Sequence, residues 1–204
     1  MTEGSGGANV VPPLAKLTRS QRWFALGRTG ATIWFTGLSA SGKSTIASEL
    51  ELRMVRMSRP AYRLDGDVVR TGLNADLGFD TASRDENLRR LAEVAKLFAD
   101  SGQVAIVSAI SPLAAQRAFA RHVHEEAGLP FVEVFVDTPI EVCEARDPKG
   151  MYAKARRGEI AEFTGVSSPY EPPEAPDVYL KERPVNEALD LVVWKLDEVE
   201  AMVR

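Results

Sequence analysis

Gly37-Leu38-Ser39-Ala40-Ser41-Gly42-Lys43-Ser44-Thr45 is the stretch that decides the fold, because it matches G-x-x-x-x-G-K-[ST] at every fixed position. In this pattern backbone N–H groups cradle phosphate oxygens, the lysine reaches the β- and γ-phosphates, and the adjoining hydroxyl can ligate Mg²⁺. An apolar, β-branched run at 31–36 precedes it, and apolar residues at helical spacing follow from Ile46 to Met57. A chance Gly/Ser-rich turn would lack this context. The sequence therefore predicts a nucleoside triphosphate site at a helix N-terminus.

Strand and helix signals alternate along the rest of the chain. Further strands are expected at 61–64, 103–109, 131–136 and 177–180. Helices are expected to begin at capping boxes on Ser83 and Thr138, at Ser111-Pro112, and at about 186. Because crossovers between parallel strands are right-handed, such units build a parallel sheet covered on both faces. The prediction is an α/β fold of the P-loop NTPase type, with three α/β/α layers around a parallel five-stranded sheet. The sequence does not determine the order of the strands.

Composition narrows the class of protein. The chain has 204 residues, about one domain, and its 45% hydrophobic and 26% charged residues are ordinary for a globular protein. A net charge of −4 argues against a protein that coats nucleic acid or an anionic membrane. Neither a transmembrane run of about 18 apolar residues nor a hydrophobic signal core is evident. Cys143 is the only cysteine, so we expect a cytoplasmic protein in which this thiol is a small buried group.

Two carboxylates follow the strand at 61–64. Asp65 and Asp67 flank a glycine, and the carboxyl ends of parallel strands face the ligand in open α/β sheets. Such carboxylates can hold Mg²⁺ through water or accept a proton from an attacking hydroxyl. An ordinary Asp-Gly turn is the alternative interpretation. Their place beside a P-loop strand favours function, and we predict Lys43, Asp65 and Asp67 as the catalytic set, with Ser44 as the direct metal ligand.

Other P-loop classes fit the chain less well. No N-K-x-D segment of a signalling GTPase is present, and no L-S-G-G-Q signature of a transporter ATPase. The strand at 103–109 also ends without a carboxylate. A stretch of basic residues at 146–157, punctuated by glycine and proline, could be a solvated charged surface. In a small-molecule kinase the same stretch would form a cationic lid over the triphosphate, which would exclude water.

Taken together, the spaced motifs resemble those of the adenylylsulfate kinase (APS kinase) family from about residue 18 onward. Their order makes the resemblance far more specific than the P-loop alone. The segments that carry it are Trp34–Ser39, Leu64–Asp67, Gly72–Phe79, Arg84–Arg90, Ile110–Pro112, Phe135–Pro139, Arg146–Gly150, Lys154–Arg156, Gly158–Ile160, Phe163–Gly165 and Ser168–Glu171.

The resemblance implies phosphorylation of the 3′-hydroxyl of adenosine 5′-phosphosulfate (APS) by ATP, with Mg²⁺, to give PAPS and ADP. It places Arg146 against the ATP adenine. On the acceptor side it implies contacts from Arg70, Arg84, Asn87, Ile110, Ser111 and Lys149, and a clasp on the APS adenine by Phe79 and Phe163. Aromatic and guanidinium planes do stack on bases, and arginine forks suit phosphate and sulfate oxygens. Read from the residues alone, both phenylalanines could instead be core residues, and Arg84 and Asn87 merely exposed helix residues.

Two positions depart from the family pattern. Val68 stands where the family usually has asparagine, and Thr71 stands where it has histidine or glutamine. Either change could weaken acceptor positioning or tune the pocket to a related nucleotide. Two alternatives therefore stay open beside an APS kinase: a P-loop kinase of a related nucleotide or small alcohol, and a nucleotide-binding module without turnover.

The expected organisation is a flexible N-terminal tail at 1–17 and a kinase domain at 18–204, with its lid at about 146–165. The resemblance also implies a homodimer and a possible association with an ATP sulfurylase. His122 and His124 lie away from every strand end used above, so we expect both on the surface.

Overall fold

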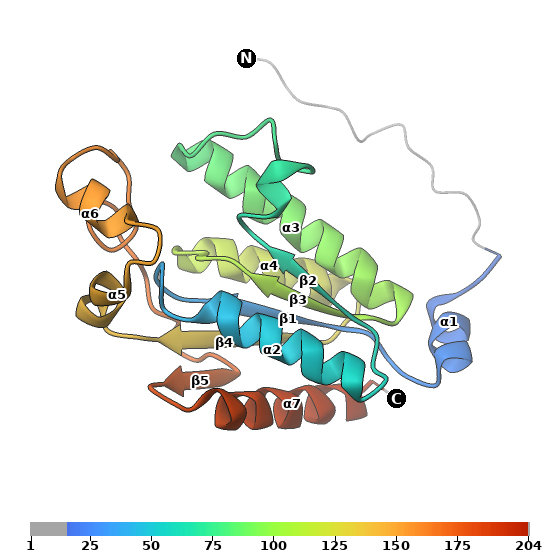
Figure 1. The fold of residues 1–204 in the computed structure, drawn as a ribbon. Helices are drawn as coiled ribbons and strands as arrows, with labels where there is room; N and C mark the ends of the chain where they lie inside the picture. Colours follow the sequence, from blue (N-terminus) through green and yellow to red (C-terminus); the bar gives the residue numbers. More distant parts are fainter. Residues whose placement is uncertain (1–15, 204) are drawn as a thin grey trace, which may run out of the picture.

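The computed structural model describes residues 16–203, and it is built around one sheet of five parallel strands. The strand order is β2-β3-β1-β4-β5 (Figure 1). Their bounds are Ala31–Thr36 for β1, Ala61–Asp65 for β2, Val104–Ser108 for β3, Phe131–Asp137 for β4 and Val178–Lys181 for β5. The structure confirms the predicted five-stranded parallel sheet and adds the order of its strands, which the sequence did not predict. The expected tail at 1–17 lies outside the described residues, apart from its last two.

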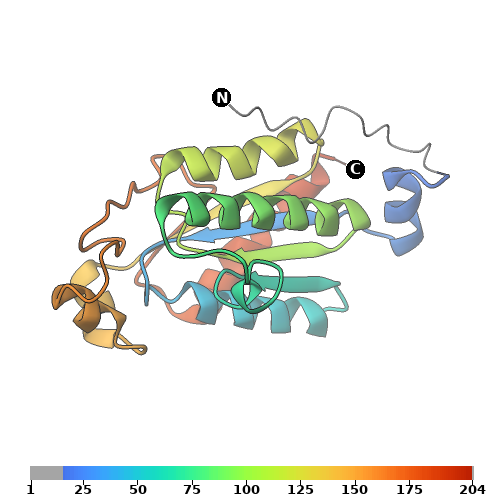
Figure 2. The same cartoon turned by 90° about the horizontal axis from the view of Figure 1, so that it is seen from above.

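Helices cover both faces of the sheet and complete the predicted three layers (Figures 1 and 2). On one face, α2 (Lys43–Arg56) and α7 (Val185–Ala201) bury Leu50 and Val192 against strand residues such as Ile33. On the other, α3 (Thr81–Ser101) and α4 (Ala114–Glu126) bury Leu91 and Ala120 against Trp34. Because successive side chains of a strand point to opposite faces, β1 feeds both cores and all six of its residues are buried.

Three predicted helix starts are wrong. Helix α3 begins two residues before Ser83, and Asp80 is its N-cap, with Oδ1 accepting from the Ser83 backbone N–H at 3.0 Å. Helix α4 begins only at Ala114, because Ser111 has φ +38° and Leu113, the N-cap, has extended backbone with ψ 140°. Helix α5 (Ile140–Arg146) follows Pro139 without the side-chain cap expected from Thr138. Two short helical segments, η1 (Val69–Thr71) and α6 (Met151–Arg156), were not predicted.

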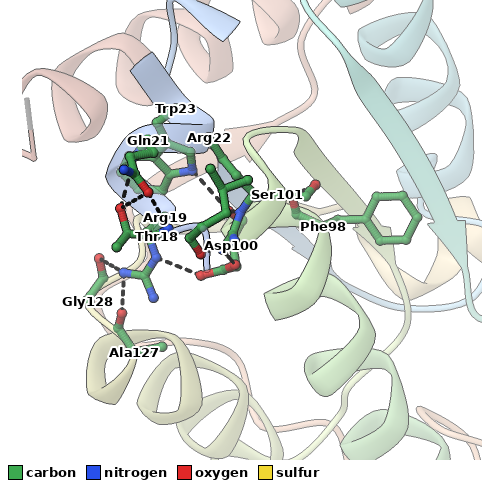
Figure 3. Close-up of polar contacts among 11 residues, drawn as sticks. Thr18, Arg19, Gln21, Arg22, Trp23, Phe98, Asp100, Ser101, Ala127 and Gly128 are labelled. Carbon is green, nitrogen blue, oxygen red and sulfur yellow. Dashed lines mark hydrogen bonds and ion pairs between the residues drawn. The ribbon is translucent and has the colours of Figure 1, made fainter. Parts of the chain in front are cut away.

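Helix α1 (Arg19–Leu26), also absent from the sequence prediction, lies at the end of the sheet opposite the P-loop (Figure 1). Arg19 donates to Asp100 Oδ1 at 2.7 Å and to Ala127 O at 2.6 Å, and Trp23 Nε1 donates to Asp100 O at 3.2 Å (Figure 3). Arg22 completes an ion pair with the same carboxylate. We call Arg19, Arg22, Trp23 and Asp100 the α1 clamp, since they join α1 to the C-terminal ends of α3 and α4.

The two histidines differ in a way that the sequence did not show. His122 is exposed on α4, as expected, beside Glu126. His124 is fully buried, so its predicted surface position is wrong. Its ring nitrogens lie 2.8 Å from Thr32 Oγ1 and 2.7 Å from Ala120 O, and burial lowers its pKa to about 4. Cys143 is buried, as predicted. Among the described residues, no helix is long and apolar enough to cross a membrane.

Candidate active site

The P-loop forms a tight turn between β1 and α2. Gly37 has φ +144°, and a Cβ there would lie 2.5 Å from Val136 O, so only glycine fits between the loop and β4. Gly42, in the left-handed region, is the N-cap of α2, and no side chain caps that helix end. The first backbone N–H groups of α2 are therefore directed at the place where the motif predicts phosphate.

Lys43 is buried at the start of α2. Its Nζ donates to Leu38 O at 2.6 Å and to Ser41 Oγ at 3.4 Å, so the loop itself holds the ammonium group. Burial lowers the pKa of Lys43 to about 8, while the negative charges of Asp65 and Asp67 act in the opposite direction. Lys43, the single cation of the loop, is thus removed from water before any nucleotide binds, and this strengthens its attraction for phosphate charge.

Three side chains outside the motif fix the loop through its carbonyl groups. Tyr152 OH donates to Ser39 O at 3.0 Å, and Thr138 Oγ1 donates to Ser41 O at 2.9 Å. Arg146 Nη1 reaches Ala40 O at 3.3 Å, which places the predicted adenine contact directly beside the loop. Sequence reasoning missed Tyr152 and Thr138 as loop contacts, because no local pattern indicates which carbonyl a distant hydroxyl meets.

The two aspartates have different surroundings. The Asp65 side chain is 11% exposed and accepts from Arg63 Nη1 at 2.9 Å and from the Asp67 backbone N–H at 3.0 Å. The Asp67 side chain is 69% exposed, and its Oδ2 pairs with Lys149 Nζ at 2.5 Å. This pairing raises the pKa of Lys149. Asp65 is therefore fixed by its neighbours, whereas Asp67 is open to a substrate and linked to the predicted lid.

The direct metal ligand predicted at Ser44 lies beside a second hydroxyl. Ser44 Oγ and Ser108 Oγ are 3.1 Å apart, and Ser108 pairs in register with Asp65 on β2. Mg²⁺ prefers oxygen ligands and keeps several waters, so hydroxyls near a fixed carboxylate suit it together with phosphate oxygens. Within residues 16–203 no group of three His, Cys, Asp or Glu side chains could form a protein-only metal cage. The donor set therefore fits a cation shared with a nucleotide.

Arg70 and Phe79 form an open platform beside η1. The Arg70 guanidinium lies 4.6 Å from the centroid of the Phe79 ring, and Arg70 Nη1 donates to Gly78 O at 2.6 Å. Phe79 is 68% exposed. An exposed aromatic ring stacked on a guanidinium has a face free for a planar ligand. Nearby on α3, Asn87 is buried and accepts from Asn74 Nδ2 at 2.9 Å.

Phe163 has the opposite environment. It is 8% exposed and packs edge-on against Tyr152, with ring centroids 4.9 Å apart, in a small core that includes Cys143. Arg84, at the start of α3, donates to Glu162 O beside it. Phe163 therefore belongs to a small core that also contacts the P-loop residues Leu38 and Ala40, and Arg84 contacts the backbone beside it.

Ile110 and Ser111 follow β3 and accept hydrogen bonds from side chains of β1. Thr36 Oγ1 donates to Ile110 O at 2.7 Å, and Trp34 Nε1 donates to Ser111 Oγ at 3.1 Å. Both partners are buried residues of β1. The predicted acceptor segment is therefore attached to the strand that carries the P-loop, which brings the two halves of the predicted site to one edge of the sheet.

A P-loop follows β1, a fixed carboxylate ends β2 with an open one two residues later, and residues of 146–152 contact both the loop and the open carboxylate. Together these features define a P-loop phosphotransferase. A sequence model of the family described as "Adenylylsulphate kinase" matches residues 29–181. An adenylyl-sulfate kinase of Emericella nidulans is 59% identical over 191 residues, which cover 90% of this chain and 93% of the relative. The chain belongs to the adenylylsulfate kinase family, and it is a kinase.

Two further relatives place the domain in context. The structure of "Mycobacterium tuberculosis APS kinase CysC in complex with AMPPNP and APS" matches with a TM-score of 0.81 and 55% identity, covering 83% of this chain and 99% of that one. A bifunctional enzyme CysN/CysC of the same species is 56% identical over 82% of this chain, which corresponds to 28% of that enzyme. A domain of this kind thus occurs both as a separate solved chain and within a longer enzyme.

Proposed function

We propose that the protein transfers the γ-phosphoryl group of ATP to the 3′-hydroxyl of APS, giving PAPS and ADP. The observation that carries the proposal is the link between Lys149 and Asp67 above the P-loop. Arg146 and Tyr152, from the same stretch as Lys149, contact the P-loop, which supports a lid that joins the open carboxylate to the phosphate cradle. Membership of the family and the solved relative with AMPPNP and APS support this choice of substrates.

The chain's own residues supply positioning and charge. Phosphoryl transfer proceeds through a loose transition state, so alignment and charge stabilisation matter more than strong base catalysis. Lys43 stabilises the charge that develops on the leaving ADP. Asp67 accepts the proton of the 3′-hydroxyl, and Asp65 orients the backbone beside it. Ser44 would hold Mg²⁺ directly, and Asp65 and Asp67 would hold it through water. The ion would neutralise phosphate charge.

ATP and APS would bind on different sides of the P-loop. ATP takes the backbone of Gly37–Thr45, with Arg146 against its adenine. APS takes Arg70, Arg84 and Asn87 around its phosphosulfate and ribose, and Ile110, Ser111 and Lys149 complete its pocket. Phe79 offers an exposed face to the APS adenine, and Phe163 engages it only after the lid at 146–165 has moved, because Phe163 is buried in the lid core.

The remaining features of the proposal concern the whole protein. We infer a kinase domain over residues 18–204, acting as a homodimer in the cytoplasm. The bifunctional relative supports association of such a domain with a second catalytic unit, and an ATP sulfurylase is the partner that the family resemblance implies.

A coupled ADP-release assay tests the activity. Purified protein is given Mg-ATP with APS, AMP, adenosine or a small alcohol in parallel, and the 3′-phosphorylated product is identified by mass. We expect turnover with APS to exceed that with each other acceptor. Higher turnover with another acceptor would favour the related-kinase alternative, for which Val68 and Thr71 are the candidate causes. ADP binding without turnover on any acceptor would favour the module without catalysis.

A further inference from the structure

A buried arginine lies directly behind the acceptor segment. Arg117, in the first half of α4, has a side chain that is 4% exposed. Its Nε lies 2.9 Å from Glu133 Oε1 on β4, which balances its charge. Burying an arginine is costly unless its charge and donors are matched, so the contacts of the remaining guanidinium nitrogens indicate what this residue does.

Those nitrogens bridge two segments that are far apart in the sequence. Nη1 donates to Ser111 O at 2.8 Å, and Nη2 donates to Glu171 O at 2.6 Å. Ser111 belongs to the proposed acceptor pocket, and Glu171 lies in the segment that leads from the lid to β5. The planar fork of an arginine can hold two carbonyl groups at a fixed separation, whereas the single ammonium group of a lysine cannot reproduce that geometry.

The backbone at Ser111 needs such support. Its φ of +38° lies in the left-handed region, which is unfavourable for a residue with a side chain. Thr36 and Trp34 hold Ser111 from the side of β1, and Arg117 holds its carbonyl group from the side of α4. A strained conformation persists only where its surroundings impose it, and strain of this kind occurs at functional sites.

The segment after the lid is attached to the same place. The Glu171 backbone N–H donates to Pro112 O at 2.8 Å, and its Oε2 accepts from the Ala114 N–H at 2.7 Å. Tyr170 OH lies 3.0 Å from Thr36 Oγ1, and the Tyr170 ring lies 5.9 Å from the Arg117 guanidinium. The acceptor segment, the start of α4 and the end of the lid segment therefore share one hydrogen-bonded junction.

We propose that Arg117 is a positioning residue for the acceptor nucleotide, which sets the backbone of Ile110 and Ser111 and couples it to residues 170–171 after the lid. This inference rests on the proposed function, because it assigns Ile110 and Ser111 to the APS pocket. Within residues 16–203 the Arg117 guanidinium bonds the carbonyl groups of Ser111 and Glu171 and makes no direct contact with the P-loop. The P-loop meets this segment only where the Gly37 N–H donates to Ile110 O at 3.5 Å, so we expect the larger effect on APS and the smaller one on ATP.

The test compares Arg117→Lys with the matched control Arg121→Lys. Arg121 lies one turn further along α4 and pairs with Glu133 and Asp177, away from Ser111 and Glu171. The loss of one charge-assisted hydrogen bond corresponds to roughly a tenfold change in an equilibrium constant. We therefore expect the KM for APS to rise about tenfold in Arg117→Lys. The KM for ATP should stay within about twofold of the parent. Arg121→Lys disturbs the shared partner Glu133 but neither Ser111 nor Glu171, so it should leave both KM values nearly unchanged.

A second variant separates positioning from general stability. In Arg117→Ala, added guanidinium ion at millimolar concentration should lower the KM for APS, whereas methylammonium ion should not. Should that variant fail to fold, Arg117→Lys decides the question by itself. Equal changes in the two KM values, or a lowered melting temperature with both KM values unchanged, would overturn the positioning role. If the parent protein does not phosphorylate APS, the proposed function fails first, and the role of Arg117 toward APS fails with it.

Discussion

The two ends of the central sheet treat their charged residues differently. At the α1 clamp, one carboxylate, Asp100, takes two arginines and receives the Trp23 N–H at its own carbonyl oxygen (Figure 3). At the P-loop end, Lys43 is held by the Leu38 carbonyl group and the Ser41 hydroxyl, and the open carboxylate of Asp67 has the exposed Lys149 as its partner.

The contrast separates contacts that a ligand can replace from contacts that it cannot. A phosphate can take the buried Lys43 from a carbonyl oxygen, because it offers the cation a full negative charge where charges interact strongly. A hydroxyl can take Asp67 from the exposed Lys149 at small cost, because exposed ion pairs are weak. At the clamp no ligand is needed, since protein groups satisfy one another. Variants at the P-loop end should therefore change activity more than stability, and variants at the other end should do the reverse.

The largest effect is expected at Lys43. Lys43→Ala removes the cation that stabilises charge on the leaving ADP, so we expect turnover to fall by at least ~10²-fold. ATP binding should weaken, while the denaturant midpoint should stay near that of the parent. Initial rates and urea unfolding of the same preparation measure both. Lys195→Ala, on α7, is the control for loss of a lysine. Parent-like turnover in Lys43→Ala would mean that the site has been placed wrongly.

Phe79 and Phe163 sharpen the comparison within the active site. Base–aromatic stacking is worth about 1–3 kcal/mol, so Phe79→Ala should weaken APS binding roughly 5- to 150-fold and ATP binding much less. Phe163→Ala should impair APS binding chiefly in the ADP-bound enzyme, and it should also lower stability, because its ring fills the lid core. Titration of APS with and without Mg-ADP measures these effects. APS binding equal to the parent in both variants would contradict the adenine clasp.

His124 is a pH-dependent test of the contacts that no ligand replaces, because protein groups are the partners of both its ring nitrogens. Its pKa is lowered from 6.5 to about 4 because the ring is buried, so between these pH values the unfolded chain binds a proton that the folded protein does not. The free energy of unfolding should fall as the pH falls through this window, by at most about 1.4 kcal/mol per pH unit from this residue. His124→Gln should remove that part of the slope. The exposed His122→Gln is the control, and identical slopes in all three proteins would count against the assignment.

The smallest effect is expected at the α1 clamp. Asp100→Ala leaves Arg19 and Arg22 without their shared carboxylate, which should lower the free energy of unfolding by about 1 kcal/mol, as for partly exposed ion pairs. Turnover of APS should not change. Asp190→Ala, which loses a more exposed pair with Arg53, should cost less. A fall in turnover without loss of stability in Asp100→Ala would show that the two ends are coupled.

Local patterns were enough to predict much of this molecule. The P-loop stretch, the buried run at 31–36 and the alternation of strand and helix signals predicted the three-layer fold, because each depends on residues close together in the chain. Asp65 and Asp67 were predicted as site residues for the same reason, since they lie at the end of a strand and two residues beyond it. The wrong start of α4 shows the limit: Ser111-Pro112 has the composition of a helix start, but contacts from β1 and α4 hold Ser111 at positive φ.

The remaining features depend on contacts between residues that are far apart in the sequence. The sequence carries the spaced motifs, and therefore the family, the fold class and the residues of the predicted site. Only the tertiary structure decided the strand order, the burial of His124, the α1 clamp and the junction at Arg117. Each of these includes a partner far away in the chain, such as Thr32 at 92 residues from His124, Asp100 at 81 from Arg19 and Glu171 at 54 from Arg117. A residue's own neighbours in the chain do not specify whether its polar atoms will meet water, a carbonyl group or a carboxylate.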